Sequence, residues 1–266
     1  MSRFPRVAPL ALAMALALPA LAQSSANTLD TVIVTGTRVA DRTVAESQSP
    51  IDIITPEALQ STGTGELATA LSRALPSLNF PRPAINDGTD TVRPAQLRGL
   101  SPDHVLVLVD GVPLTKQDTT GAVSLEHIML DQVERIEIVR GNVSAIHGSG
   151  AVGGVIQVFT RQGQGQPMVY ASAERGGQGT QRWSAGTHGS AGPLAYAVSV
   201  GRFRTEGINA ANLSQTTNAN PDADGYHNNN HALNLSYTLS PEHKLGVRST
   251  HFKGQFDYDV SGSFAE

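Results

Sequence analysis

Hydrophobic and polar positions alternate strictly along the last hundred residues of the chain. In Leu233–Leu239 and in Leu194–Val200, every second residue is leucine, tyrosine or valine and the residues between them are small or polar. This period of two predicts strands with one apolar face. The pattern is weaker in Met168–Glu174, Lys244–Phe252 and Gly179–Gly189. The sequence therefore predicts about five strands of roughly ten residues, the length that a tilted strand needs to cross a bilayer.

The connections between these strands differ in length. Gly189–Pro193 and Pro241–Glu242 are short, whereas Glu206–Asn230 forms a long polar loop. Short turns at one end and long loops at the other are typical of bacterial outer-membrane barrels. A soluble β-sandwich is the alternative that alternation alone leaves open. About five strands are too few to close a barrel, because bacterial barrels have roughly eight or more, so we expect an incomplete wall and a truncated or partial reading frame.

Residues 45–162 have a mixed pattern. Ile51–Ile54 predicts a strand, and Thr55 with Pro56 predicts a helix start, as N-cap and first helical residue. A second helix is predicted from Thr64 or Gly65 up to Pro76, because leucines recur every fourth residue on one face.

Three further strands are expected in this region. Val105–Val109 is a continuous apolar run, typical of a strand buried on both faces, and Asp110–Gly111 predicts a tight turn after it. Val133–Arg140 and Val155–Thr160 follow; in the first, Arg135 and Glu137 lie opposite the isoleucines and predict a structural ion pair. Residues 45–162 are thus expected to form one small α+β domain.

The N-terminus predicts export. Arg3 and Arg6 precede the apolar stretch Val7–Leu18, and Ala20–Ala22 fits a cleavage site, so residues 1–22 read as a signal peptide. The chain has no cysteine and a net charge of −4, which excludes disulfides and thiolate metal sites and gives no electrostatic footprint for nucleic acid.

Motifs for catalysis fail on inspection. Gly148–Gly153 matches G-x-G-x-x-G, but a β-branched strand follows where a dinucleotide site needs a helix. The histidines form no His-Glu-x-x-His, and His104, His127 and His147 are expected at surfaces. No enzyme activity is predicted.

One metal hypothesis remains. Asn220–Gly225 places Asp222 and Asp224 as the first half of a calcium loop would, and Asp257 and Asp259 lie in the next loop. His231 stands where an EF-hand has its glutamate. A solvated Asp/Asn turn is the alternative interpretation.

A short strand-like segment follows the signal peptide. Asp30–Arg38 contains a β-branched run within a polar stretch that has the composition of unfolded chain. Such a segment is suited to capture by the edge of a partner's sheet.

The ordered motifs together resemble one family. Leu97–Leu100, Val105–Val112, Val133–Gly141 and Gly153–Ile156 are similar to the plug signature of TonB-dependent outer-membrane receptors, in the layout of the cobalamin and ferric-siderophore transporters. The resemblance implies a plug inside a barrel of about 22 strands. The fold class is thus an α+β plug domain followed by antiparallel β-strands of an incomplete transmembrane β-barrel. Its parts are a signal peptide (1–22), a periplasmic segment (23–44), the plug (45–162) and a partial barrel (167–266).

The resemblance also implies site residues. The energy-coupling box that TonB captures comprises Asp30, Thr31, Val32, Ile33, Val34 and Thr35. The structural and gating positions of the plug signature are Arg98, Gly99, Asp110, Gly111, Arg135, Glu137, Arg140, Gly141, Gly153 and Gly154. Ligand is expected at apical plug loops, at Arg82, Asn86, Arg93, Gln117 and Asp118. Asp222 and Asp224 match a calcium-binding loop of the cobalamin receptors, so structural calcium at Asp222, Asp224, Asp257 and Asp259 is the one cofactor considered.

The function implied is active nutrient uptake across the outer membrane. The expected partners are TonB of the inner-membrane energy-transducing complex, outer-membrane lipid and a small ligand, with a ferric siderophore first and cobalamin as the alternative. A truncated, non-transporting remnant and a soluble periplasmic binding module are the rival interpretations.

Overall fold

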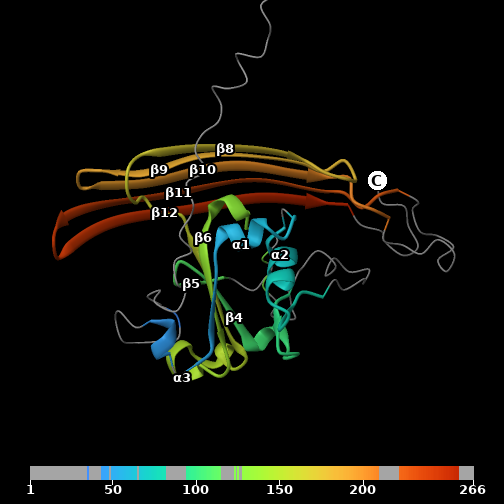
Figure 1. Cartoon of the computed structure of the whole chain (residues 1–266), viewed down its shortest axis with the longest axis horizontal. Helices are drawn as coiled ribbons and strands as arrows, with labels where there is room; N and C mark the ends of the chain where they lie inside the picture. The colour runs from blue at the N-terminus through green and yellow to red at the C-terminus, as the bar shows by residue number, and fades with distance from the viewer. Residues whose placement is uncertain are drawn as a thin grey trace, which may run out of the picture.

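The computed structural model describes residues 35, 43–47, 49–64, 66–81, 94–114, 123, 125, 128–209 and 222–257. They form an N-terminal domain (43–160) and a sheet of long strands (168–257), which we call the long-strand sheet. Figure 1 shows the long strands running across the strands of the N-terminal domain, at one end of that domain.

The N-terminal domain is built on a five-stranded sheet in the order β1-β6-β7-β4-β5, in which β4 and β7 are parallel and the other pairs antiparallel. Its strands are β1 (Ile51–Ile54), β4 (Val105–Val109), β5 (Val112–Pro113), β6 (Val133–Arg140) and β7 (Gly154–Thr160). A separate pair joins β2 (Leu78–Asn79) to β3 (Gln96–Leu97). The helices and 3₁₀ turns are η4 (Val44–Glu46), α1 (Pro56–Gln60), α2 (Leu67–Ala74), η6 (Pro102–His104), η7 (Leu130–Gln132), α3 (Ser144–His147) and η8 (Ser149–Ala151).

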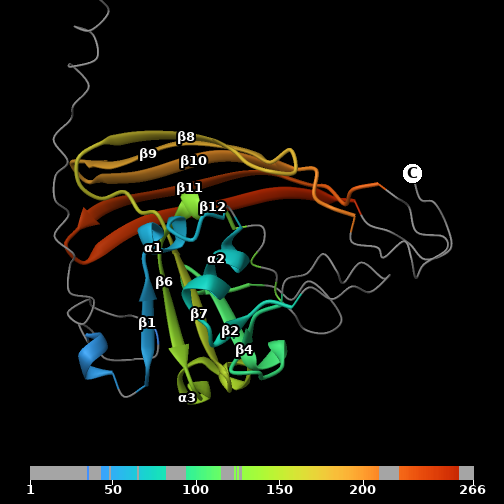
Figure 2. The ribbon, with the colours of Figure 1, turned by 45° about the vertical axis from the view of Figure 1, so that its right-hand side comes forward.

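Two apolar clusters cover the two faces of this sheet. On one face, Leu59 of α1 and Leu67 and Leu71 of α2 are fully buried against β4, β6 and β7. On the other face, Val139 and Val155 pack with Val143, which precedes α3, and with Ala151 of η8. Figure 2 shows α3 at the end of the domain farthest from the long-strand sheet. Because both faces are covered, all seven residues of β7 are buried.

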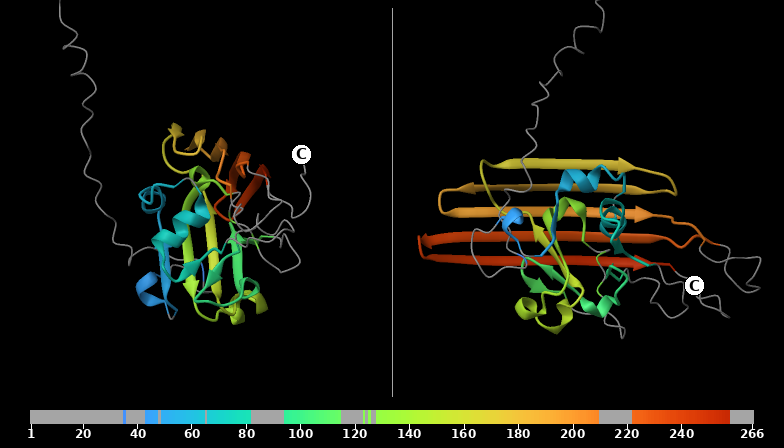
Figure 3. Two further views of the ribbon diagram at one scale, coloured as in Figure 1. Left: turned by 90° about the vertical axis from the view of Figure 1, so that its right-hand side faces the viewer. Right: turned by 60° about the horizontal axis from the view of Figure 1, so that its bottom comes forward.

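The long-strand sheet has the order β12-β11-β10-β9-β8, with every neighbouring pair antiparallel. Its strands are β8 (Met168–Arg175), β9 (Gln181–Ala191), β10 (Leu194–Thr205), β11 (Tyr226–Ser240) and β12 (His243–Phe256). Figure 3 shows them as a single open layer. One face of this layer meets the N-terminal domain; the other exposes apolar side chains such as Val200, Leu245 and Val247, which are 43%, 63% and 61% exposed.

The fold class predicted from the sequence is confirmed, with two corrections to element bounds. Thr55 caps α1 by accepting a hydrogen bond from the Ala58 amide at 3.4 Å, as expected, but α2 begins at Leu67 rather than at Thr64 or Gly65. The long polar loop predicted up to Asn230 ends earlier, because β11 begins at Tyr226. The polar residues at the start of β11 pair with Thr205–Gly201 of β10. Of these, Asn228 and Asn230 are buried on the face toward the N-terminal domain, so they need no apolar partner.

Among the described residues, no helix has both the length and the apolar character required to cross a membrane.

Candidate functional site between the two sheets

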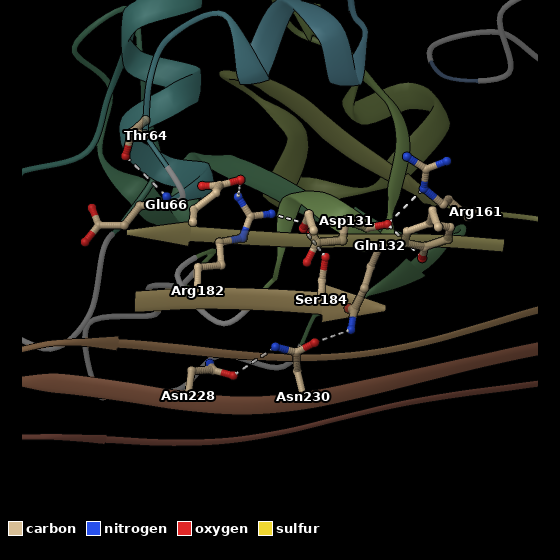
Figure 4. Close-up of polar contacts among 12 residues, drawn as sticks. Thr64, Glu66, Asp131, Gln132, Arg161, Arg182, Ser184, Asn228 and Asn230 are labelled. Atoms are coloured by element: carbon tan, nitrogen blue, oxygen red, sulfur yellow. Dashed lines mark hydrogen bonds and ion pairs between the residues drawn. The ribbon is translucent and has the colours of Figure 1, made fainter. Parts of the chain in front are cut away.

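The N-terminal domain meets the long-strand sheet through η7, the turn that leads into β6. Asp131 and Gln132 of this turn point at the inner face of β9 and β11 (Figure 4). Asp131 contacts Arg182 of β9, and Gln132 contacts Asn230 of β11. Each contact joins residues that lie far apart in the sequence and therefore shows how the two sheets dock. We call Asp131, Gln132, Arg182 and Asn230 the docking network.

An ion pair forms the first half of the docking network. The Arg182 guanidinium of β9 contacts the Asp131 carboxylate, and its side chain is only 6% exposed. A second carboxylate, that of Glu174 on β8, lies 3.4 Å away but is 57% exposed. Burial raises the pKa of the Asp131 carboxyl above its ordinary value, although Arg182 and the Ser184 hydroxyl act in the opposite direction. The ionised pair is therefore held in a site that disfavours the charge of Asp131.

Amide side chains form the second half. Gln132 Nε2 donates a hydrogen bond of 2.8 Å to Asn230 Oδ1 on β11, and both side chains are buried. Asn230 Nδ2 in turn lies 3.5 Å from Asn228 Oδ1, which is fully buried. Buried amides are costly to leave unpaired, so this ladder fixes where η7 can sit on β11.

The segment that joins the two sheets is tied to the same turn. The Arg161 amide and its Nε donate to the carbonyls of Gln132 and Asp131, each at 2.8 Å. The Gln162 amide donates to Glu134 Oε2 at 3.0 Å. The segment between the N-terminal domain and the long-strand sheet is therefore held by η7, so a movement of the N-terminal domain should displace the start of the long-strand sheet.

A second contact lies at the turn after β4. Asp110 has a positive φ of 49° and accepts a hydrogen bond from the Thr160 amide at 3.0 Å, so it closes β4 onto the end of β7. Arg248 of β12 reaches the same residue, with 3.9 Å between its Nη1 and Asp110 Oδ2. A small pocket between the sheets is lined by polar residues such as Asp110, Gln132, Arg161 and Arg248 and by apolar ones such as Val198 and Leu233.

Thr35, the last residue of the box, contacts the N-terminal domain. Thr35 is fully buried, and its amide donates a 3.0 Å hydrogen bond to Glu137 Oε2 of β6. Glu137 is also fully buried and forms the predicted ion pair with Arg135 at 3.0 Å. The Arg135 guanidinium lies 3.9 Å from the centre of the Phe159 ring. Asp30, Thr31, Val32, Ile33 and Val34 lie outside the described residues.

The remaining signature residues have local structural partners. Arg140 pairs with Asp52 of β1 at 2.7 Å, and the Arg98 amide donates to the Ser77 carbonyl at 2.9 Å. Arg98, Gly99, Gly111 and Gly141 all have positive φ. Gly154, with φ of 149°, has no room for a side chain, since a Cβ there would lie 2.5 Å from Leu97 Cδ2 and still closer to the Val139 carbonyl oxygen. Gly153 is nearly as crowded, at 3.1 Å from the His104 carbonyl oxygen.

The ligand residues predicted in the apical loops, Arg82, Asn86, Arg93, Gln117 and Asp118, all lie outside the described residues, as do Asp259 and His127. Asp222, Asp224 and Asp257 are described, and the Asp257 amide donates to the Gly225 carbonyl at 2.9 Å, which brings the two acidic segments together. Among the described residues, however, no group of three metal-ligating side chains converges. The calcium hypothesis remains a prediction.

The sequence pattern does not predict the docking network. Arg182 sits in the weakest of the alternating segments, and Asn230 sits in a segment assigned to a loop. One signal was available in the alternation of the strands. Arg182 of β9 and Phe203 of β10 occupy the alternate positions that also hold the small residues of the inner face, and these two residues lie directly opposite each other. A charged residue on the side opposite the apolar stripe is a candidate for contact with whatever that side covers.

Comparison with known proteins agrees with this architecture. Residues 43–155 match the family model of the TonB-dependent Receptor Plug Domain. The vitamin B12 transporter BtuB of Photobacterium profundum is 27% identical over 240 residues, which are 90% of this chain and 38% of that protein.

Solved structures resemble both sheets together. The ferric enterobactin receptor PfeA, in complex with BCV-L6, superposes with a TM-score of 0.62 at 26% identity over 79% of this chain and 34% of its own; this receptor comes from Pseudomonas aeruginosa. The siderophore receptor PirA of Acinetobacter baumannii has a TM-score of 0.62 at 21% identity, over 82% of this chain and 33% of its own, which is a likeness of fold alone. The chain thus spans between about a third and two fifths of the length of these relatives.

Proposed function

We propose that this chain is the N-terminal part of an outer-membrane receptor for active nutrient uptake. The premise is that residues 43–155 belong to the plug domain family of TonB-dependent receptors. The N-terminal domain acts as the plug and the long-strand sheet as part of the barrel wall. In this assignment residues 1–22 serve as the export signal, 23–44 as the periplasmic segment, and 167–266 as wall.

One observation carries this proposal: the two faces of the long-strand sheet have opposite chemistry. The inner face holds buried polar residues that bind the N-terminal domain, namely Arg182, Ser184 and Asn230. Asn228, which contacts Asn230, is buried on the same face. The outer face exposes valines and leucines that water would not favour. A wall between a plug and a bilayer requires this division, because lipid accepts the apolar face and a satisfied polar face must turn inward.

The proposed mechanism begins with ligand binding at the apical loops of the N-terminal domain and at the outer loops of the wall. Binding shifts the box (residues 30–35) from a docked to an accessible population. TonB then adds a strand to the box by main-chain hydrogen bonds. Traction on the box passes into β6, where Glu137 holds Thr35, and displaces η7 from its contacts on β9 and β11.

The cargo we propose first is a ferric siderophore, and the second is cobalamin. The siderophore receptors PfeA and PirA share the fold, while BtuB is named as a vitamin B12 transporter. Growth and uptake assays with a panel of iron sources and with cobalamin, in a closed-barrel receptor that carries this chain, decide between them.

The coupling step is tested by replacing Val32 with proline in such a receptor. Proline removes a backbone donor and fixes φ, so TonB can no longer pair with the box while the ligand loops stay intact. We expect uptake to be lost and ligand binding at the cell surface to be unchanged. The matched control is Ala26→Pro, which makes the same change in the polar stretch before the box and should leave both unchanged. Normal uptake by the Val32→Pro receptor would refute the coupling assignment.

A further inference from the structure

The outer face of the long-strand sheet carries cations at one end only. Four exposed side chains, Arg175, Arg202, Arg204 and Lys253, lie on two adjacent rows of this face. The first row runs Ala173, Trp183, Arg202, Asn229, Lys253, and the second runs Arg175, Gln181, Arg204, His227, Gln255. We call the four cations the basic belt.

Neither row contains a carboxylate that could neutralise the basic belt. Within residues 168–209 and 222–257, the ion pairs of the structure involve Arg182 and Arg248, both of which point to the inner face. The nearest acids on the same face, Glu206 and Asp257, lie one row further from the apolar stripe. Four positive charges therefore stand together on an exposed surface with no described partner.

The position of the basic belt along the strands indicates what it faces. The same face carries Val198 and Val200 on β10, and Leu245 and Val247 on β12, in the rows on one side of the belt. Those apolar rows lead to the short turns at Gly192–Pro193 and Pro241–Glu242, while the belt lies toward the long connection between Thr205 and Tyr226. Bacterial barrels place short turns in the periplasm and long loops outside. The belt is therefore at the outer end of the apolar stripe.

We propose that the basic belt binds the phosphate groups of a phosphorylated glycolipid in the outer leaflet. This inference rests on the proposed function, since it requires the outer face to lie in a bilayer. Guanidinium groups bind phosphate oxygens with paired, charge-assisted hydrogen bonds, which suits three arginines in two rows. Trp183, 47% exposed in the first row, has the amphipathic ring that favours the boundary between acyl chains and headgroups.

The chain supplies its own probe, because Trp183 is its single tryptophan. The full chain is placed in phosphatidylcholine vesicles that contain increasing fractions of a diphosphorylated glycolipid or of its dephosphorylated form, and Trp183 emission is recorded. We expect a saturable change with the phosphorylated form only. Each basic residue near an anionic surface changes binding by about fivefold, so Arg202→Gln with Lys253→Gln should raise the half-saturating mole fraction about 25-fold.

Lys244→Gln is the matched control, because Lys244 is an exposed cation on β12 outside both rows; it should leave the titration unchanged. An equal response to both glycolipids would overturn the basic belt while leaving the sheet in the bilayer. A response to inorganic phosphate alone, in pure phosphatidylcholine, would also overturn it. If no vesicle changes Trp183 emission relative to the chain dissolved in urea without lipid or detergent, the sheet does not meet lipid, and the proposed function itself fails.

Discussion

Replacing Arg182 with glutamine tests how much the docking network holds the N-terminal domain against the long-strand sheet. The Arg182 side chain is 6% exposed and its partner Asp131 is 11% exposed, so the variant leaves a carboxylate in a nearly dry interface. Removing one partner of a buried ion pair costs about 3–5 kcal/mol. The Ser184 hydroxyl still donates to Asp131, and we therefore expect a somewhat smaller loss, about 2–4 kcal/mol.

Hydrogen exchange of the backbone amides measures this loss directly. A reduction of about 2–4 kcal/mol in the free energy of local opening accelerates exchange about 30- to 1000-fold. We expect this acceleration in peptides that cover η7 and Arg161, and none in the β7 core. Arg204→Gln, an arginine that faces outward on β10, is the matched control and should leave η7 unchanged.

Asp131→Asn sharpens the test. Since burial raises the pKa of Asp131, this site favours the neutral form more than water does, and Arg182 keeps its contact with Glu174 at 3.4 Å. The asparagine variant should therefore accelerate exchange much less than Arg182→Gln. If Asp131→Asn opens η7 strongly and Arg182→Gln has no effect, the assignment of the buried arginine as the anchor is wrong.

Three further perturbations follow from the same contacts. Glu137→Ala removes the acceptor of the Thr35 amide hydrogen bond. Because a hydrogen bond to a charged group contributes about 1.5–3 kcal/mol, a cysteine placed in the box should react with maleimide at least about tenfold faster. An unchanged rate would show that Glu137 does not hold the box. Gly154→Ala forces a Cβ onto the Val139 carbonyl and should lower the free energy of unfolding by about 3 kcal/mol in urea titrations, whereas Gly165→Ala, at an open position, should cost about 1 kcal/mol. Because the pKa of Asp131 is raised in the docked state, Asp131 takes up a proton on docking at pH values between its ordinary and its raised pKa. Docking therefore strengthens as the pH falls through that interval. Hydrogen exchange of the η7 amides, corrected for its intrinsic pH dependence, should slow there in the native chain and not in Asp131→Asn.

The main strands and the first helix of the N-terminal domain were predictable because their signals are local, whereas α3 and the β2–β3 pair were not predicted. Thr55 and Pro56 mark a helix start by capping, and the apolar run Val105–Val109 reads as a buried strand without knowledge of its neighbours. The start of α2 was placed too early because Glu66, not Thr64, takes the N-cap position. The backbone of Glu66 is extended because Glu66 forms an antiparallel bridge with Met129, a residue more than sixty positions further along the chain.

The docking network could not be read from the sequence for a related reason. Asn228 and Asn230 look like loop residues, since asparagine is poor in strands judged by propensity. They form a strand because β10 offers the backbone partners and Gln132 offers the side-chain partner. The alternation in β9 shows only that Arg182 lies opposite the apolar stripe; its partner, Asp131, is known from the structure alone. Contacts between distant segments decide these positions, and such contacts leave no local pattern.

A cross-link between the box and TonB in outer membranes tests the coupling step most directly. The chain has no cysteine, so Ile33→Cys introduces a unique thiol that can form a disulfide with a cysteine on the edge strand of the TonB periplasmic domain. Capture of the box by TonB predicts a cross-link that increases when ligand is added and disappears when Val32→Pro is present in the same chain. A cross-link that ligand and the proline leave unchanged, or none at all while the receptor still takes up its ligand, would contradict it.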